Sequence, residues 1–411
     1  MPLWCWCATI SIPCLNCWKQ PSSTPIFIWD STAWMATDAQ VIPMFPLTRR
    51  NFLAASALLL SPAARVLAVT TSDNSTLYLS AASTRDDHHF VTGFRHSGNT
   101  LQQIFQLALP ERGHHIAVNH QRGFMISIAR RPGTSLVLAE LATGKLIQEI
   151  RVPTDRHLYG HGVFSNDGNW FYTTENAFDD QSENSGRLVV WSVQGEGSNI
   201  KLQREQDYPS GGIGPHELLL MPNGETLAIA NGGIRTHPSH DRDILNLDTM
   251  KPSLAYLDRQ SGKLLEQRFL PDEFHQASIR HLDASADGTV VIGMQFEGEA
   301  FMAVPLVAVH QAGQELRLLD APPEVQSQLQ QYVGAIRFAA DGRHFAATCP
   351  RGNQFTVWDA TDGKFVSALR ARDNCGVIAT DKGFLFSTGL GKVAELDLPS
   401  GNVTELEGAE T

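Results

Sequence analysis

Apolar and polar positions alternate along most of the chain in short stretches that are typical of β-strands. From residue 74 onward, apolar runs such as "RLVVWSV" (187–193) and "FTVWDA" (355–360) are separated by turns rich in Gly, Asp and Asn. Strands that are apolar on both faces are typical of sheets covered on both sides by neighbouring sheets. The pattern therefore predicts an all-β chain built from several packed sheets.

Two tight turns recur in a fixed order within this pattern. The first occurs in "SNDGNW" (165–170), "MPNGET" (221–226), "SADGTV" (285–290), "AADGRH" (339–344) and "TDKGF" (380–384). The second occurs in "ATGKL" (142–146), "QSGKL" (260–264), "TDGKF" (361–365) and "PSGNV" (399–403). Asn-Gly and Asp-Gly pairs supply the positive φ angles of two-residue hairpins. Each unit is therefore expected to hold four antiparallel strands.

The turns divide the chain into seven units with a period of about fifty residues. Their limits are 74–110, 111–153, 154–209, 210–271, 272–322, 323–371 and 372–407. Seven such units predict a seven-bladed β-propeller of the WD40 or YVTN-like type. A two-sheet sandwich is the alternative, but it seldom repeats one motif seven times. The first unit shows only three clear strands, so the ring is expected to borrow a closing strand from the other terminus.

Composition agrees with a chain that folds around a large core. Of 411 residues, 42% are hydrophobic and 18% are charged, which is not the balance of a disordered chain. Three tryptophans, Trp170, Trp191 and Trp358, are expected in the core between blades. We assign residues 69–411 to a single propeller domain.

The segment before the repeats reads as an export signal. Residues 47–68, "LTRRNFLAASALLLSPAARVLA", combine paired arginines, a short apolar run and small residues before Ala68. This pattern predicts a twin-arginine signal peptide at residues 44–68, cleavage after Ala68 and a periplasmic protein. The apolar run is shorter than the roughly 20 residues that span a bilayer, so no permanent membrane span is expected.

Residues 1–43 are expected to be a mis-called, disordered start, because export signals normally begin within a few residues of the initiator and Met44 stands directly upstream of this one. Removing residues 1–68 takes away four basic and two acidic residues and changes the net charge from −11 to −13. An acidic protein of this kind is an unlikely partner for nucleic acid. Two cysteines, Cys349 and Cys375, remain, which does not indicate a disulfide framework.

Histidines recur at equivalent places in four consecutive units. They stand in "RGHHIAV", "YGHGVFS", "GPHELLL" and "IRHLDAS", at His115, His161, His216 and His281. Each is expected to begin the innermost strand of its blade, and this would bring the four to the mouth of the central channel. The segment "GGIGPHELLLMPNGETLAIANGGIRTHP" (211–238) adds His237 at the end of the returning strand, on the same predicted rim as His216.

The candidate ligand-binding set gathers these histidines and the polar residues at the ends of the paired strands: His115, His161, Glu175, Asn176, His216, Glu217, Asn231, Arg235, His237, Arg280, His281 and Gln295. Neutral imidazole suits iron, copper and zinc, so His161, His216 and His281 are the candidate metal ligands, with iron or copper as the candidate ion. Binding of an anionic or hydroxylated organic ligand, helped by Arg130, Arg235 and Arg280, and a purely structural role are the alternatives. A metal held by ordinary histidines is expected to dissociate below pH of about 6.

Several of these segments together resemble a bacterial exported family of unknown function. The likeness is carried by "RGHHIAV", "GHGVFSNDGNWFYTTEN", "GIGPHELLLMPNGETLAIANGGIRTHP", "NLDTMKPSLAYLD" and "SIRHLDASADGTVVIGMQFEG" and runs from about residue 74 to 400. The resemblance implies a seven-bladed propeller, related in fold to quinoprotein amine dehydrogenase and YVTN propellers. It also implies a gene beside imelysin-type iron-uptake proteins, which are therefore candidate partners.

A looser likeness connects "GPHELLLMPNGETLAIAN" to propeller lactonases, over about one blade. The sequence lacks the doubled Pro-His pattern usual in those enzymes. Whether the protein is an enzyme stays open. We expect an exported propeller that binds a metal or a metal-bearing small ligand in an iron-uptake setting, and a lactonase-like hydrolase acting on a small sugar or organic-acid lactone is the alternative.

Overall fold

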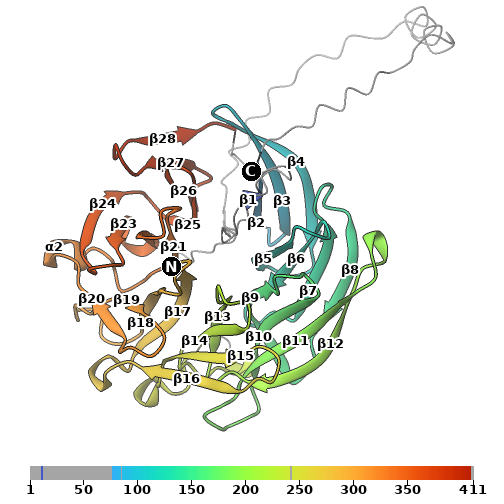
Figure 1. The fold of residues 1–411 in the computed structure, drawn as a ribbon, viewed down its shortest axis with the longest axis horizontal. Helices are drawn as coiled ribbons and strands as arrows, with labels where there is room; N and C mark the ends of the chain where they lie inside the picture. Colours follow the sequence, from blue (N-terminus) through green and yellow to red (C-terminus); the bar gives the residue numbers. More distant parts are fainter. Residues whose placement is uncertain (1–10, 13–75, 85, 241–242, 409–411) are drawn as a thin grey trace, which may run out of the picture.

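Six of the seven predicted repeats each fold into one four-stranded antiparallel sheet, the first repeat supplies three strands of a seventh such sheet, and the seven sheets form a ring (Figure 1). The structure is a computed structural model that describes residues 11–12, 76–84, 86–240 and 243–408. The prediction of an all-β, seven-bladed propeller is confirmed. Each predicted unit limit encloses the strands of one blade, apart from the additional strand of the first blade.

The strands follow one another from the innermost to the outermost position of each blade. Blade 1 has β1 (Ser11–Ile12), β2 (Leu77–Ser83), β3 (His89–Ser97) and β4 (Thr100–Leu109), and blade 2 has β5 (Gly113–Asn119), β6 (Phe124–Ala129), β7 (Ser135–Glu140) and β8 (Leu146–Arg151). Blade 3 has β9 (Arg156–Phe164), β10 (Trp170–Ala177), β11 (Gly186–Gln194) and β12 (Lys201–Pro209), and blade 4 has β13 (Pro215–Leu220), β14 (Thr226–Asn231), β15 (Ser253–Asp258) and β16 (Leu264–Phe269). Blade 5 has β17 (Ala277–Ala284), β18 (Val290–Phe296), β19 (Val307–His310) and β20 (Arg317–Leu319). Blade 6 has β21 (Ala335–Phe338), β22 (His344–Cys349), β23 (Gln354–Asp359) and β24 (Phe365–Arg370), and blade 7 has β25 (Asn374–Ala379), β26 (Gly383–Thr388), β27 (Val393–Asp397) and β28 (Val403–Leu406).

The Asp-Gly turns between the first two strands of a blade form for the local reason that the sequence predicted. Gly168 has a φ of 67°, and the Asp167 carboxylate accepts hydrogen bonds from the Asn169 N–H at 3.1 Å and from the Ser165 hydroxyl. The same arrangement recurs in blade 5, where Gly288 has a φ of 87°. An aspartate that satisfies the turn's donors and a glycine that accepts positive φ together fix the hairpin.

Apolar side chains from adjacent blades share the core. Trp358 is fully buried, and Trp191 is 2% exposed, with its indole N–H donating to Thr173 at 2.9 Å. The expectation that Trp170 also lies in the core between blades is wrong, because the residue begins β10 beside the turn and is 36% exposed. Its place at the end of the strand leaves no neighbouring blade to cover it.

Blades 7 and 1 close the ring by direct contact. The Leu101 N–H donates to the Glu407 carbonyl at 2.9 Å, and Leu101, Tyr78 and Phe94 pack with Ile378 and Leu406 in one buried cluster. All four strands of blade 7 come from the C-terminal segment. The expectation that the C-terminal end supplies a strand to blade 1 is therefore wrong. The fourth strand of blade 1 is β1, which pairs with β2 and comes from the N-terminal region.

The predicted signal peptide (44–68) lies outside the described residues, as does the predicted mis-called start (1–43) apart from the two residues of β1. Within the described part of the chain, no helix is long and apolar enough to cross a membrane.

Candidate functional site

The innermost strands of blades 2 to 5 each contain an irregularity in pairing near the histidine that recurs in the repeat pattern. The register shifts between Gly113 and His115 in β5, opposite Thr173–Glu175 in β9, between Pro215 and Leu218 in β13, and between Ile279 and His281 in β17. A β-bulge re-aims the side chains around it. It thus frees consecutive residues from strict alternation between the two faces of a sheet.

These bulges lie within the strands, which corrects one expectation from the sequence. His216 stands near the start of its strand, but β9 begins at Arg156 and β17 at Ala277, several residues before His161 and His281. The four histidines are equivalent because of the bulges, and two of them do not begin their strands.

Five imidazole rings meet in this region. The ring centroids of His161 lie 4.8 Å from those of His114 and His216 and 5.2 Å from that of His115, and the centroids of His216 and His281 are 5.0 Å apart. Glu217 joins them, with its carboxylate accepting from His281 Nδ1 at 3.0 Å and lying 3.8 Å from His161 Nδ1. We call His114, His115, His161, His216, Glu217 and His281 the histidine cluster.

His114 is the member that the sequence analysis missed, although "RGHHIAV" offers two adjacent histidines. In a regular strand only one of them would face the cluster, but the bulge at Gly113–His115 brings both rings into it. Gly160 makes room for His114, because a Cβ at this position would collide with the His114 ring. Its φ of 104° is also one that residues with a side chain rarely adopt.

Burial favours the neutral form of four imidazoles of the cluster, those of His114, His115, His161 and His216. Removal from water lowers the pKa of His114, His161 and His216 well below the ordinary value, and neighbouring positive charges lower it further. Burial likewise lowers the pKa of His115 to about 4. Because neutral imidazole is the form that binds metal, the cluster is already in its ligand state near pH 7.

Glu217 stays ionised although it is buried. Burial alone raises the pKa of its carboxyl, but the hydrogen bond from His281 and the charges of His281, Arg337 and His115 outweigh this and lower the pKa overall. The carboxylate also accepts the Leu282 N–H at 3.3 Å. A negative oxygen therefore lies among the neutral rings.

Several ring nitrogens of the cluster have no hydrogen-bond partner among residues 76–84, 86–240 and 243–408. They are both nitrogens of His115, both of His161 and Nδ1 of His216. Buried polar atoms are nearly always hydrogen-bonded, so orphaned atoms in a cluster need an explanation such as an ion or a ligand.

Two groups of donors in the cluster lie close enough together that they could hold a metal ion. In the group of His114, His161 and His216, and in the group of His161, Glu217 and His281, the ligand atoms lie within 4.8 Å of one another. Ligand atoms in a tetrahedral site with bonds of about 2.0 Å are roughly 3.3 Å apart. Metal binding would therefore draw the rings inward, which rotation about the side-chain bonds allows.

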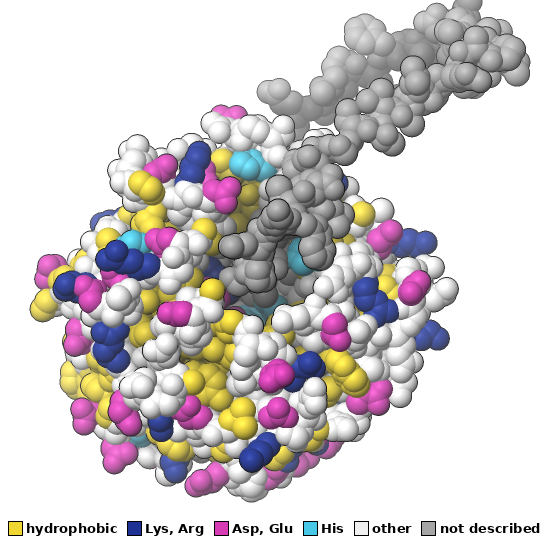
Figure 2. Space-filling model, viewed as in Figure 1, with side chains coloured by type: hydrophobic (Ala, Val, Ile, Leu, Met, Phe, Trp, Pro, Cys, Tyr) yellow, Lys and Arg dark blue, Asp and Glu magenta, His cyan; other side chains and the backbone are white. Residues whose placement is uncertain are grey.

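Arginines beside the cluster are held by carboxylates. Arg280 forms an ion pair with Glu297 at 3.4 Å, and Arg337 forms one with Asp283 at 3.1 Å. On the face shown in Figure 2, histidine side chains are visible at the inner edge of the ring, whereas charged residues of both signs spread over its outer part.

Four other predicted site residues are engaged within the sheets. Glu175 forms a two-pronged ion pair with Arg204 at 2.8 and 3.0 Å, and the Asn176 amide donates to the His157 ring and to the Thr236 carbonyl. Asn231 exchanges hydrogen bonds with Ser210, and Gln295 donates to the Val333 carbonyl at 3.2 Å. Because these partners lie within the blades, the four side chains support the scaffold.

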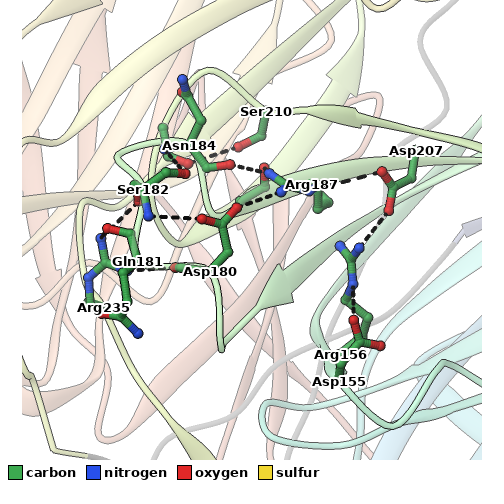
Figure 3. A network of polar contacts seen from close by, with 12 residues as sticks. Asp155, Arg156, Asp180, Gln181, Ser182, Asn184, Arg187, Asp207, Ser210 and Arg235 are labelled. Carbon is green, nitrogen blue, oxygen red and sulfur yellow. Dashed lines mark hydrogen bonds and ion pairs between the residues drawn. The ribbon is translucent and has the colours of Figure 1, made fainter.

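Arg235 belongs to a loop network at the rim of blades 3 and 4 (Figure 3). Arg235 donates to the carbonyls of Asp180, Gln181 and Ser182, and the Asp180 carboxylate is in turn paired with Arg187 at 2.6 Å. His237 lies 3.3 Å from Asp179 and packs on Phe178. The structure thus gives His237 contacts of its own in this loop, and the metal-spaced donor groups include His216 but not His237.

Cys349, one of the two cysteines that follow residue 68, is a buried thiol at the end of β22. Burial raises its pKa to about 12, so it remains protonated near pH 7.

The fold and the cluster define a class of protein: a seven-bladed β-propeller with a group of buried histidines and one carboxylate on the inner strands of four consecutive blades. The family model described as "Protein of unknown function (DUF1513)" matches residues 107–410, and the chain belongs to this family. All six residues of the cluster lie within the matched segment.

Solved structures support the fold. Hydrazine synthase from Kuenenia stuttgartiensis is similar with a TM-score of 0.53 and 14% identity, over 80% of this chain and 95% of that one. A protein from Lactobacillus plantarum has a TM-score of 0.53 and 15% identity over 75% and 85% of the two chains. A protein proposed to be a 6-phosphogluconolactonase, from Bacteroides uniformis, has a TM-score of 0.51 and 12% identity over 74% and 84%. Among curated proteins, none matches the sequence.

Proposed function

We propose that the protein binds a transition metal ion, iron or copper, through its histidine cluster. The observation that carries this proposal is the convergence of five imidazoles and one carboxylate, with ring nitrogens that have no hydrogen-bond partner among the described residues. Imidazole suits iron, copper and zinc, and a carboxylate with two histidines suits Fe(II). A hydrogen-bonding role alone would pair the ring nitrogens with protein groups, as it does for His310.

The predicted export signal gives this proposal its setting. We propose that Arg49 and Arg50 direct the folded protein to the periplasm and that cleavage follows Ala68. The mature first blade would then retain β2, β3 and β4. A role in iron uptake beside imelysin-type proteins would suit a periplasmic metal-binding protein. This part of the proposal rests on the family resemblance alone.

Hydrolysis of a lactone is the second candidate. It draws on the likeness of one segment to propeller lactonases and on the fold neighbour proposed to be a 6-phosphogluconolactonase. A panel of sugar and organic-acid lactones tests it directly. A metal binder without hydrolytic activity would leave every lactone of the panel intact.

Metal analysis tests the first candidate. Full-length protein is dialysed against copper(II) and, under anaerobic conditions, iron(II), and the retained metal is measured for wild type, His161→Ala and His216→Ala. We expect affinity to fall on the order of 100-fold or more, since even residues that only orient metal ligands are worth 10- to 100-fold. His310→Ala is the matched control, because His310 is a buried histidine outside the cluster with both ring nitrogens bonded. Equal metal content in all four proteins would refute the proposal.

A further inference from the structure

The two donor groups of the histidine cluster share one residue. His114, His161 and His216 form the first group, and His161, Glu217 and His281 form the second. Six donor positions thus come from five residues, and His161 is counted twice. Each group has three ligand atoms within 4.8 Å of one another, which is enough protein donors for one ion with an open position.

The chemistry of the two groups differs. Three imidazoles suit copper or zinc, whereas two imidazoles and one carboxylate suit a non-haem iron ion. Within the second group, the Glu217 carboxylate accepts a hydrogen bond from His281. The two groups therefore have unlike donor sets, and His161 is common to both.

His161 has the right atoms to serve both halves. An imidazole has two nitrogens on different sides of the ring, and neither nitrogen of His161 has a hydrogen-bond partner in the described ranges. Its Nδ1 lies 3.8 Å from the Glu217 carboxylate, so it faces the second group. Nε2 is the remaining atom, and the other two residues of the first group, His114 and His216, each have their ring centroid 4.8 Å from that of His161.

We infer that the cluster holds two metal ions bridged by the imidazole of His161, an inference that rests on the proposed metal binding. The bridge forms when the single N–H proton of neutral His161 leaves to water and both nitrogens then donate lone pairs, one to each ion. The resulting imidazolate and the Glu217 carboxylate each contribute one negative charge, which offsets part of the charge of two divalent ions.

Copper(II) is the probe for the test, because each Cu(II) ion carries one unpaired electron. Two Cu(II) ions joined by an imidazolate couple their spins, so the electron paramagnetic resonance signal at low temperature counts fewer spins than the copper present. We expect wild type at neutral pH to bind two copper ions per chain, with a spin count well below the copper content. The spin count should recover toward one per copper as acid protonates the bridge.

Variants locate the bridge. Glu217→Gln and His114→Ala each weaken one group, so both should hold about one copper with its full signal. His161→Ala should show no coupled pair, and His310→Ala should behave like wild type. Circular dichroism of each variant establishes that the propeller is folded.

The outcomes separate this inference from the proposed function. One copper per chain in wild type, or two coppers with a full spin count, would overturn the two-ion bridge and leave the proposed metal binding in place. Absence of bound copper and iron in wild type would overturn both.

Discussion

At the scale of single residues, Gly160 determines how closely His114 can approach the other rings. The residue has a φ of 104°, and a Cβ would collide with the His114 ring. We expect Gly160→Ala to destabilise the fold by about 1–3 kcal/mol and to weaken metal binding. Denaturant unfolding and metal titration measure the two effects.

Gly288→Ala is the matched control for this substitution. Gly288 also has a positive φ, 87°, but nothing lies within 4 Å of the position of a Cβ. Gly288→Ala should lower the free energy of unfolding, because of the strained backbone, without lowering metal affinity. Equal metal affinity in Gly160→Ala and Gly288→Ala would contradict the role assigned to Gly160.

The neutral state of the buried histidines makes the metal-free protein sensitive to acid. Burial lowers the pKa of His115 to about 4, whereas a histidine in the unfolded chain has a pKa of about 6.5. Between these values the unfolded state binds more protons, so stability is full above pH of about 6.5 and decreases as pH falls toward 4. His115 alone contributes up to about 1.4 kcal/mol per pH unit in this window.

His115→Phe keeps a ring and removes the titration. We expect the decrease in unfolding free energy between pH 6.5 and pH 4 to become shallower than in wild type, as measured by urea unfolding of metal-free protein. An unchanged slope would show that His115 does not titrate as described. The lowered pKa values of His114, His161 and His216 also move metal loss to a lower pH than the value of about 6 expected from ordinary histidines.

At the scale of strands, the outer strand of blade 3 neutralises a buried carboxylate. Glu175 on β10 is completely buried, and burial raises its pKa although the ion pair with Arg204 on β12 opposes this. Arg204→Ala would leave the carboxylate without its partner, and we expect a loss of about 3 kcal/mol in unfolding free energy. Metal content should not change, since Glu175 acts within the sheet.

The control for Arg204→Ala is Lys392→Ala. Lys392 and Glu405 form an exposed pair, so we expect a change of about 0.5 kcal/mol or less. If Arg204→Ala is folded but binds less metal, Glu175 contributes to the binding site, as the sequence predicted.

Strand order and turns could be predicted from the sequence because their causes are local. Asp167 and Gly168 form their turn with groups within a few residues, and the same local chemistry repeats along the chain. The bulges could not be predicted, because they depend on the register with the neighbouring strand, and they decide that both His114 and His115 enter the cluster. The partners of Glu175 and Asn231 also come from neighbouring strands and loops, so a polar residue at a strand end did not reveal its role.

At the scale of the whole molecule, the ring depends on the contact between the last and the first blade. Leu406 is 6% exposed and packs with Leu101 and Tyr78 across this junction. Leu406→Ala should destabilise the protein by about 2–4 kcal/mol in thermal or denaturant unfolding. Val403→Ala on the same strand is the control, because Val403 is 48% exposed and should cost about 0.5 kcal/mol or less. Equal effects would mean that the junction does not hold the ring closed.

The ring also explains how residues far apart in the sequence form one cluster. The strands β5, β9, β13 and β17 are the innermost strands of adjacent blades, so equivalent positions in them meet although they lie tens of residues apart. A metal at this place would join four blades at once. It would therefore stabilise the folded ring by a free energy that grows with the logarithm of the ratio of the metal concentration to its dissociation constant.

The most direct test of metal binding by the histidine cluster is a crystal structure of the copper-loaded protein with anomalous diffraction data collected at the copper absorption edge. We expect an anomalous peak within bonding distance of His161 and of at least two other cluster residues. Copper only at surface histidines such as His237 and His240, with no peak among the cluster rings, would contradict metal binding by the histidine cluster.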